Sequence, residues 1–80
     1  MDQRLWDVYV PTDRADALAE GLRAQVKAIG GRVKRTTRAR LKDQTRLHVA
    51  LETPAGAEGI ENVYAVVRWI ASQGATVTGS

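Results

Sequence analysis

The order of hydrophobic and polar residues divides the chain into six short segments, four with the period of a strand and two with that of a helix. Residues 4–10 alternate between apolar and polar side chains, as expected of a strand with one face on a core. Pro11 ends this segment, because proline cannot donate a hydrogen bond to a sheet. The predicted inner face holds Trp6, Val8 and Val10, and the outer face includes Asp7 and Tyr9.

Residues 15–29 carry apolar side chains three and four positions apart, the spacing of one face of an α-helix. Gly30 and Gly31 follow, and glycine commonly ends a helix. The segment therefore predicts an amphipathic helix. Its inward-facing residues are Ala15, Leu18, Ala19, Leu22, Val26 and Ile29.

Residues 32–41 and 45–53 alternate like strands and are separated only by a polar turn, which predicts an antiparallel hairpin. The second strand turns Leu47, Val49 and Leu51 inward. In the first strand, strict alternation places Arg35 inward, together with Val33, Thr37, Ala39 and Leu41. The residues that it places outward are Arg32, Lys34, Thr36, Arg38 and Arg40. An inward arginine needs an explanation: either its head reaches the sheet edge or a β-bulge turns it out.

A second helix is predicted from about residue 58 to residue 73, where Gly74 stops it. Its expected inner stripe is Ile60, Val63, Tyr64, Val67, Ile70 and Ala71. Residues 75–78 form a short final strand. The resulting order, β-α-β-β-α-β, predicts a single α+β domain over residues 1–80 with the ferredoxin-like architecture. We expect a four-stranded antiparallel sheet in the order 4-1-3-2, with both helices on one face.

Charge is unevenly distributed along the chain, whose net charge is +3. Residues 32–46 hold seven basic groups and one acid, giving +6, and the remaining residues hold five basic groups and eight acids, giving −3. A concentrated positive field attracts anionic partners. If the first strand turns Tyr9 outward, this charge lies beside an aromatic ring on an open sheet, which favours binding of RNA or DNA. The predicted contact residues are Tyr9, Arg32, Lys34, Arg38, Arg40, Arg46 and His48.

Two other interpretations of these features remain open. The strand at residues 32–41 is predicted to lie at a sheet edge, where charge also prevents pairing with other molecules. In addition, the second helix carries Val66 and Trp69 away from its expected inner stripe. An exposed tryptophan is a frequent anchor for a protein partner, so the alternative function is an adaptor or inhibitor module, or a homodimer, that uses this helix face or a sheet edge.

Several functional classes are disfavoured by what the sequence lacks. There is no cysteine, and His48 is the only histidine, so neither a disulfide nor a cysteine- or histidine-rich metal site is expected. No phosphate-binding loop or paired catalytic residues emerge, and we predict neither an enzyme nor a cofactor. The third predicted strand lacks the aromatic signature of the RNA recognition motif. No segment is apolar enough to cross a membrane, and the protein is predicted to be soluble and cytoplasmic.

Overall fold

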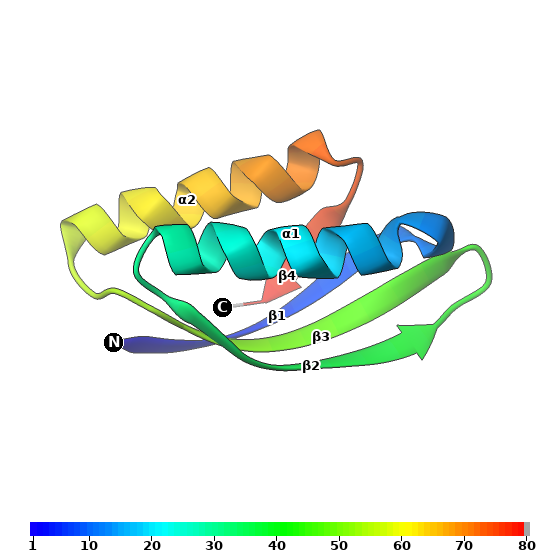
Figure 1. Ribbon diagram of the computed structural model, residues 1–80, viewed down its shortest axis with the longest axis horizontal. Coiled ribbons are helices and arrows are strands. Elements are labelled where there is room, and N and C mark those ends of the chain that lie inside the picture. Colours follow the sequence, from blue (N-terminus) through cyan, green and yellow to red (C-terminus); the bar gives the residue numbers. More distant parts are fainter. Residues whose placement is uncertain (80) are drawn as a thin grey trace.

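The computed structural model describes residues 1–79 and contains the six predicted elements in the predicted order (Figure 1). A single turn of 3₁₀ helix, η1, precedes the first α-helix. The elements are β1 (Asp2–Pro11), η1 (Thr12–Arg14), α1 (Ala15–Ala28), β2 (Arg32–Arg40), β3 (Gln44–Thr53), α2 (Ala57–Ser72) and β4 (Thr76–Gly79).

The four strands form one antiparallel sheet in the order β2-β3-β1-β4, and both helices lie on the same side of it (Figure 1). The predicted fold class and strand order are therefore confirmed. The long strands β1 and β3 occupy the centre and pair along their whole length, from Asp2 with Thr53 to Pro11 with Gln44. Strand β2 forms one edge, and the short strand β4 forms the other.

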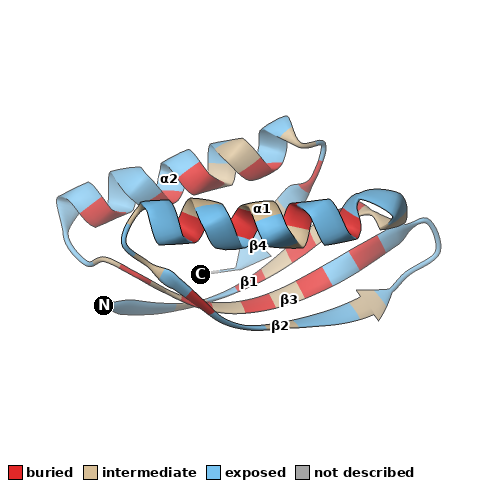
Figure 2. Ribbon diagram, viewed as in Figure 1, coloured by how far each residue is buried: buried red, intermediate tan, exposed pale blue. Residues whose placement is uncertain are grey.

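The core lies between the sheet and the two helices (Figure 2). Every second residue of β1 and β3 points into it, as the sequence alternation predicts. On α1 the buried residues are one turn apart, so that helix contributes the predicted face. Fully or nearly fully buried side chains include Trp6, Val8, Val10, Leu18, Leu22, Val26, Leu47, Val49 and Leu51.

The end of α1 shows why two glycines follow it. Gly30 adopts φ of +83°, a backbone conformation that costs little only for glycine. Its N–H donates to the carbonyl of Lys27 at 3.0 Å, and the N–H of Gly31 donates to the carbonyl of Val26 at 2.9 Å. These two bonds satisfy carbonyls at the helix end and turn the chain directly into β2.

Helix α2 is rotated about its axis relative to the sequence-based prediction. Its buried residues are Gly59, Val63, Val66 and Ile70. By contrast, Ile60 and Tyr64, both predicted to face inward, are 51% and 59% exposed. Ala71, also predicted to face inward, is exposed as well. The prediction was wrong for these three residues because α2 carries apolar residues over more than half of its circumference. Helical spacing alone cannot choose between overlapping stripes.

The packing of Trp69 against α1 accompanies this rotation. A Cβ atom placed on Gly21 would lie 2.6 Å from Cη2 and 2.7 Å from Cζ2 of the Trp69 ring, so the indole occupies space that only glycine leaves free. Trp69 is partly buried against the core, and Val66 is 1% exposed. The prediction that Val66 and Trp69 form an exposed surface for a protein partner is therefore wrong. Trp69 packs against Gly21 of α1, and Val66 belongs to the buried core.

Candidate functional site

The open face of the sheet is the surface that the helices leave uncovered, and its neighbours follow from strand pairing. Directly paired residues of an antiparallel sheet point to the same face. Tyr9 is paired with Arg46 of β3 and with Thr76 of β4, and Asp7 in the next row is paired with His48. The predicted placement of Tyr9, Arg46 and His48 on one face is confirmed.

Asp7 and His48 are bonded to each other in the centre of this face. The distance between His48 Nδ1 and Asp7 Oδ1 is 2.7 Å, and both side chains are partly exposed. The bond connects the two central strands and fixes the imidazole one row from Tyr9. It also occupies one oxygen of Asp7, which lies two residues before Tyr9 on the same strand face.

A β-bulge in β2 changes which cations reach the open face. The pairing passes from Val33 with Leu51 directly to Arg35 with Ala50, so Lys34 is the inserted residue. An inserted residue reverses the faces of all positions that follow it. Arg35 therefore joins the open face, which resolves its inward assignment by the second of the two alternatives.

The same bulge moves two predicted contact residues to the other side of the sheet. Arg38 is paired with Leu47 and Arg40 with Thr45, and both of these partners are buried beneath the helices. The prediction that Arg38 and Arg40 share a face with Arg46 is therefore wrong. Residues 36–41 continue the alternation set before the bulge, so the inward assignment of Arg35 was the one sign in the sequence of a change of face.

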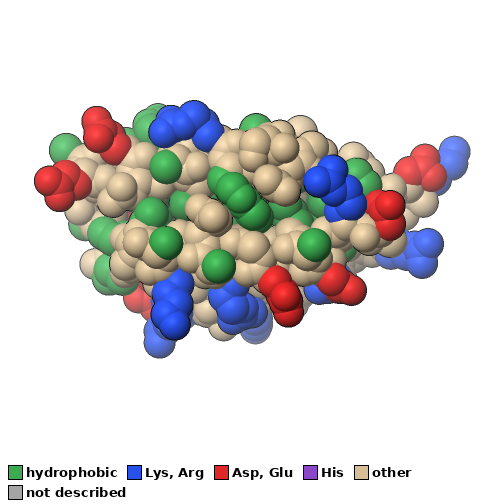
Figure 3. Space-filling model, turned by 45° about the horizontal axis from the view of Figure 1, so that its top comes forward, with side chains coloured by type: hydrophobic (Ala, Val, Ile, Leu, Met, Phe, Trp, Pro, Cys, Tyr) green, Lys and Arg blue, Asp and Glu red, His purple; other side chains and the backbone are tan. Residues whose placement is uncertain are grey.

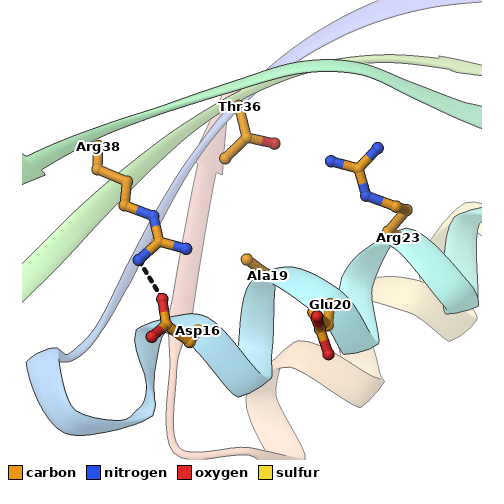
Figure 4. Close-up of a pocket in the computed structure, with 6 residues that line it drawn as sticks. All are labelled: Asp16, Ala19, Glu20, Arg23, Thr36 and Arg38. Atoms are coloured by element: carbon orange, nitrogen blue, oxygen red, sulfur yellow. Dashed lines mark hydrogen bonds and ion pairs between the residues drawn. The ribbon is translucent and has the colours of Figure 1, made fainter.

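Arg38 contributes instead to a groove between β2 and α1. Its guanidinium group forms an ion pair with Asp16 at one end of the groove, and the guanidinium group of Arg23 stands at the other end (Figure 4). The groove has a volume of about 500 Å³ and is lined by Asp16, Ala19, Glu20, Arg23, Thr36 and Arg38. Two acids offset two bases here, so the groove offers no net charge for an anion.

At the opposite end of the open face, Glu52 neutralises part of the positive charge. Arg32 Nη2 donates to Glu52 Oε1 at 2.9 Å, and Lys34 Nζ lies 3.9 Å from the same oxygen. Lys34 also donates to Gln3 Oε1 at 3.1 Å. The hydrogen bond from Arg32, with the charges of Arg32 and Lys34, lowers the pKa of Glu52 below its ordinary value of 4.5 despite partial burial, which acts in the opposite direction.

Replacing Arg32 by glutamine is expected to raise the pKa of Glu52 towards 4.5, because the largest cause of its lowering is removed. The folded-state pKa of Glu52 is depressed. The ionised Glu52 carboxylate therefore contributes to stability at pH values above its unfolded-state pKa, and this contribution is lost as the pH falls through its folded-state pKa. An NMR titration of the Glu52 side-chain carboxyl measures the shift. Arg35→Gln, on the same face but not bonded to Glu52, is the matched control and should leave this pKa unchanged.

Four exposed cations on the β2–β3 hairpin have no ion pair or side-chain hydrogen bond within residues 1–79. They are Arg35, Arg40, Lys42 and Arg46. Arg35 and Arg46 lie on the open face, Arg40 on the helix side of the edge, and Lys42 in the turn. Sequence reasoning left Arg35 out of the contact set, although its anomalous inward assignment was the signal that a bulge was present.

The described residues also bear on metal binding and on membrane insertion. No three His, Cys, Asp or Glu side chains gather where they could hold a metal ion among residues 1–79. Within the same range, neither helix is long and apolar enough to span a membrane.

Comparisons with known proteins identify a fold. No protein-family model matches the chain, and no curated protein sequence matches it. The solution structure of the C-terminal domain of the MgtC protein from Mycobacterium tuberculosis is similar, with a TM-score of 0.81 and 7% identity, over 98% of this chain and 86% of that one. The de novo designed protein Ferredog-Diesel has a TM-score of 0.56 and 13% identity, over 99% and 84%. At these identities the likeness shows the fold alone, which is ferredoxin-like.

Proposed function

We propose that this protein is a non-enzymatic module that binds single-stranded nucleic acid on the open face of its sheet and along the β2–β3 hairpin. The observation that supports the proposal most is the group of four exposed cations without acidic partners, Arg35, Arg40, Lys42 and Arg46. Binding of a phosphate by such a group releases counterions and breaks no existing ion pair. Arg32 and Lys34 contribute less because Glu52 already neutralises them in part.

Tyr9 supports a single strand over a duplex as the ligand. Its ring lies on the central strand beside Arg46, with the bonded pair of Asp7 and His48 in the next row. An aromatic ring on an open sheet stacks on an unpaired base, whereas the bases of a duplex already stack on one another. In this arrangement Tyr9 contacts a base and Arg46, its direct neighbour, contacts an adjacent phosphate. Arg35 is in register with Ala50, four residues further along the sheet, and contacts a more distant phosphate of the same strand.

The proposal predicts a steep loss of binding as salt concentration rises, measured by fluorescence anisotropy with a labelled oligothymidine. The double variant Arg35→Ala, Arg46→Ala removes two phosphate contacts. It should make the slope of log K against log salt shallower by about 1.4, since each contact on a single strand contributes about 0.7. Tyr9→Ala should weaken binding about 5- to 150-fold at every salt concentration, as expected for loss of one stacked base.

Arg14→Ala is the matched control for the charge change, because Arg14 is exposed in the helical layer, away from the open face. It should leave both the affinity and the salt slope unchanged within error. If wild-type protein fails to bind the oligonucleotide at low salt, or if Arg14→Ala alone makes the slope shallower by about 0.7, the change expected for one phosphate contact, the open face is not a nucleic-acid site.

A further inference from the structure

The rotation of α2 leaves an apolar stripe of that helix outside the core. Ile60 and Tyr64 are 51% and 59% exposed, and Val67 and Ala71 continue the same stripe, with Val67 partly buried. Successive members lie three or four residues apart, so they form one face of the helix. This face is turned away from α1, since α2 contacts α1 through Trp69 on its other side. Figure 3 shows hydrophobic and charged side chains together along the outer margin of the helical layer.

Two opposite charges stand on the solvent side of this stripe. Glu61 lies three residues before Tyr64, and Arg68 lies four residues after it. Seven residues are almost two full helical turns, so Glu61 and Arg68 share a face but are about 10 Å apart along the axis. Neither has an ion-pair or side-chain hydrogen-bond partner within residues 1–79. Together with Tyr64 they border a shallow hollow of about 450 Å³.

We propose that this stripe binds a second copy of the same chain, with the two α2 helices antiparallel across a two-fold axis near Tyr64. In an antiparallel pair, the same flank of each helix meets its own counterpart. Glu61 of one copy then faces Arg68 of the second copy, and the reciprocal pair forms by symmetry. The acid and the base lie at nearly equal distances on either side of Tyr64, so the surface is complementary to itself.

The edge strand β2 is another place where two copies could meet, and its charge disfavours that pairing. It carries five cations and no acid: Arg32, Lys34, Arg35, Arg38 and Arg40. Two such strands placed side by side would bring like charges together without compensation, which is destabilising. The α2 stripe has no such conflict. It also lies in the helical layer, so association through it leaves the open face free and does not depend on the proposed nucleic-acid function.

The expected dimer is weak, because contact along a single helix from each copy falls in the range of small, transient interfaces. Sedimentation velocity over protein concentrations from roughly 10 µM to 1 mM should therefore show a concentration-dependent shift from monomer to dimer. Glu61→Arg and Arg68→Glu each place two like-charge pairs at the interface. Each should weaken association about tenfold or more.

The double variant Glu61→Arg, Arg68→Glu distinguishes this geometry from a loose hydrophobic association. It restores opposite charges with their positions exchanged, so its dimerisation should return to within about threefold of the wild type. Glu20→Arg, the same change of charge on an exposed position of α1, is the matched control and should have no effect. Circular dichroism of each variant verifies the fold.

The proposal is overturned by a wild-type protein that stays monomeric throughout the range, which would leave the stripe to a different partner. It is also overturned if the single variants dimerise like the wild type, or if the double variant fails to recover while remaining folded. Tyr64→Glu provides a second measurement, because a carboxylate at the axis would face its own copy. Undiminished dimerisation of Tyr64→Glu would likewise exclude this interface.

Discussion

Trp69→Ala is expected to lower the free energy of unfolding by about 2–4 kcal/mol, whereas Tyr64→Ala should change it by about 0.5 kcal/mol or less. The two residues differ in their surroundings: Trp69 packs over Gly21 against the core, and Tyr64 is 59% exposed. Urea denaturation at low protein concentration, where self-association does not contribute, measures both values. The opposite ranking would mean that α2 presents the stripe predicted from sequence to the core.

A double-mutant cycle with Gly21 tests the contact itself. In the wild type, a methyl group at position 21 meets the edge of the indole ring at 2.6 Å, so Gly21→Ala forces the ring to move. When Trp69→Ala has removed the ring, the same substitution should stabilise the protein by up to about 1 kcal/mol, since alanine is the better helix former. A coupling energy near zero between the two substitutions would show that the ring does not lie over Gly21.

Gly59→Ala is expected to cost about 2 kcal/mol and to lower the melting temperature by roughly 8–16 °C. Gly59 is buried in the first turn of α2, directly against the backbone of Pro54. A Cβ atom there would overlap the Pro54 carbonyl oxygen and lie 2.7 Å from its carbon. Unlike the ring edge beside Gly21, this backbone cannot move without displacing the connection between β3 and α2.

Thermal unfolding followed by circular dichroism measures this effect, with Gly21→Ala as the comparison. Both substitutions add one methyl group to a helical glycine, and alanine is the better helix former at both positions. The structure predicts a much larger loss at Gly59, because its neighbour is backbone and that of Gly21 is the far end of a side chain. Equal melting temperatures for the two variants would contradict this account of how α2 begins.

The structure of the basic hairpin determines which of its cations are available to bind a ligand. In the sequence, Arg32, Lys34, Arg38 and Arg40 alternate as if they shared one face. In the structure, the bulge distributes cations over both sides of the edge strand, and acids on neighbouring elements engage some of them. The cations that remain unpaired are therefore more informative about binding than the length of the basic run. This distinction selects Arg35 and Arg46 for mutation ahead of Arg38.

The alternation of the strands and the ends of the helices could be predicted from the sequence because each depends on neighbouring residues alone. Trp6, Val8 and Val10 face the core since successive side chains of a strand point to opposite sides. Gly30 ends α1 because a left-handed backbone conformation is required at that position. From such signals the element order, and with it the ferredoxin-like topology, follows by general rules of chain connection.

Tertiary contacts determine two features for which the sequence pattern allows more than one arrangement. The first is the rotation of α2. Several overlapping apolar stripes of this helix have helical spacing, and the contacts of Gly21 with the Trp69 ring and of Gly59 with Pro54 determine which stripe faces the core. The second is the face of Arg38, which changed when pairing with β3 left Lys34 as an inserted residue. By itself, the sequence determined the elements, their order and the charge of the hairpin. Which side chains remain exposed and unpaired depended on packing between residues far apart in the chain, and those side chains carry both proposals.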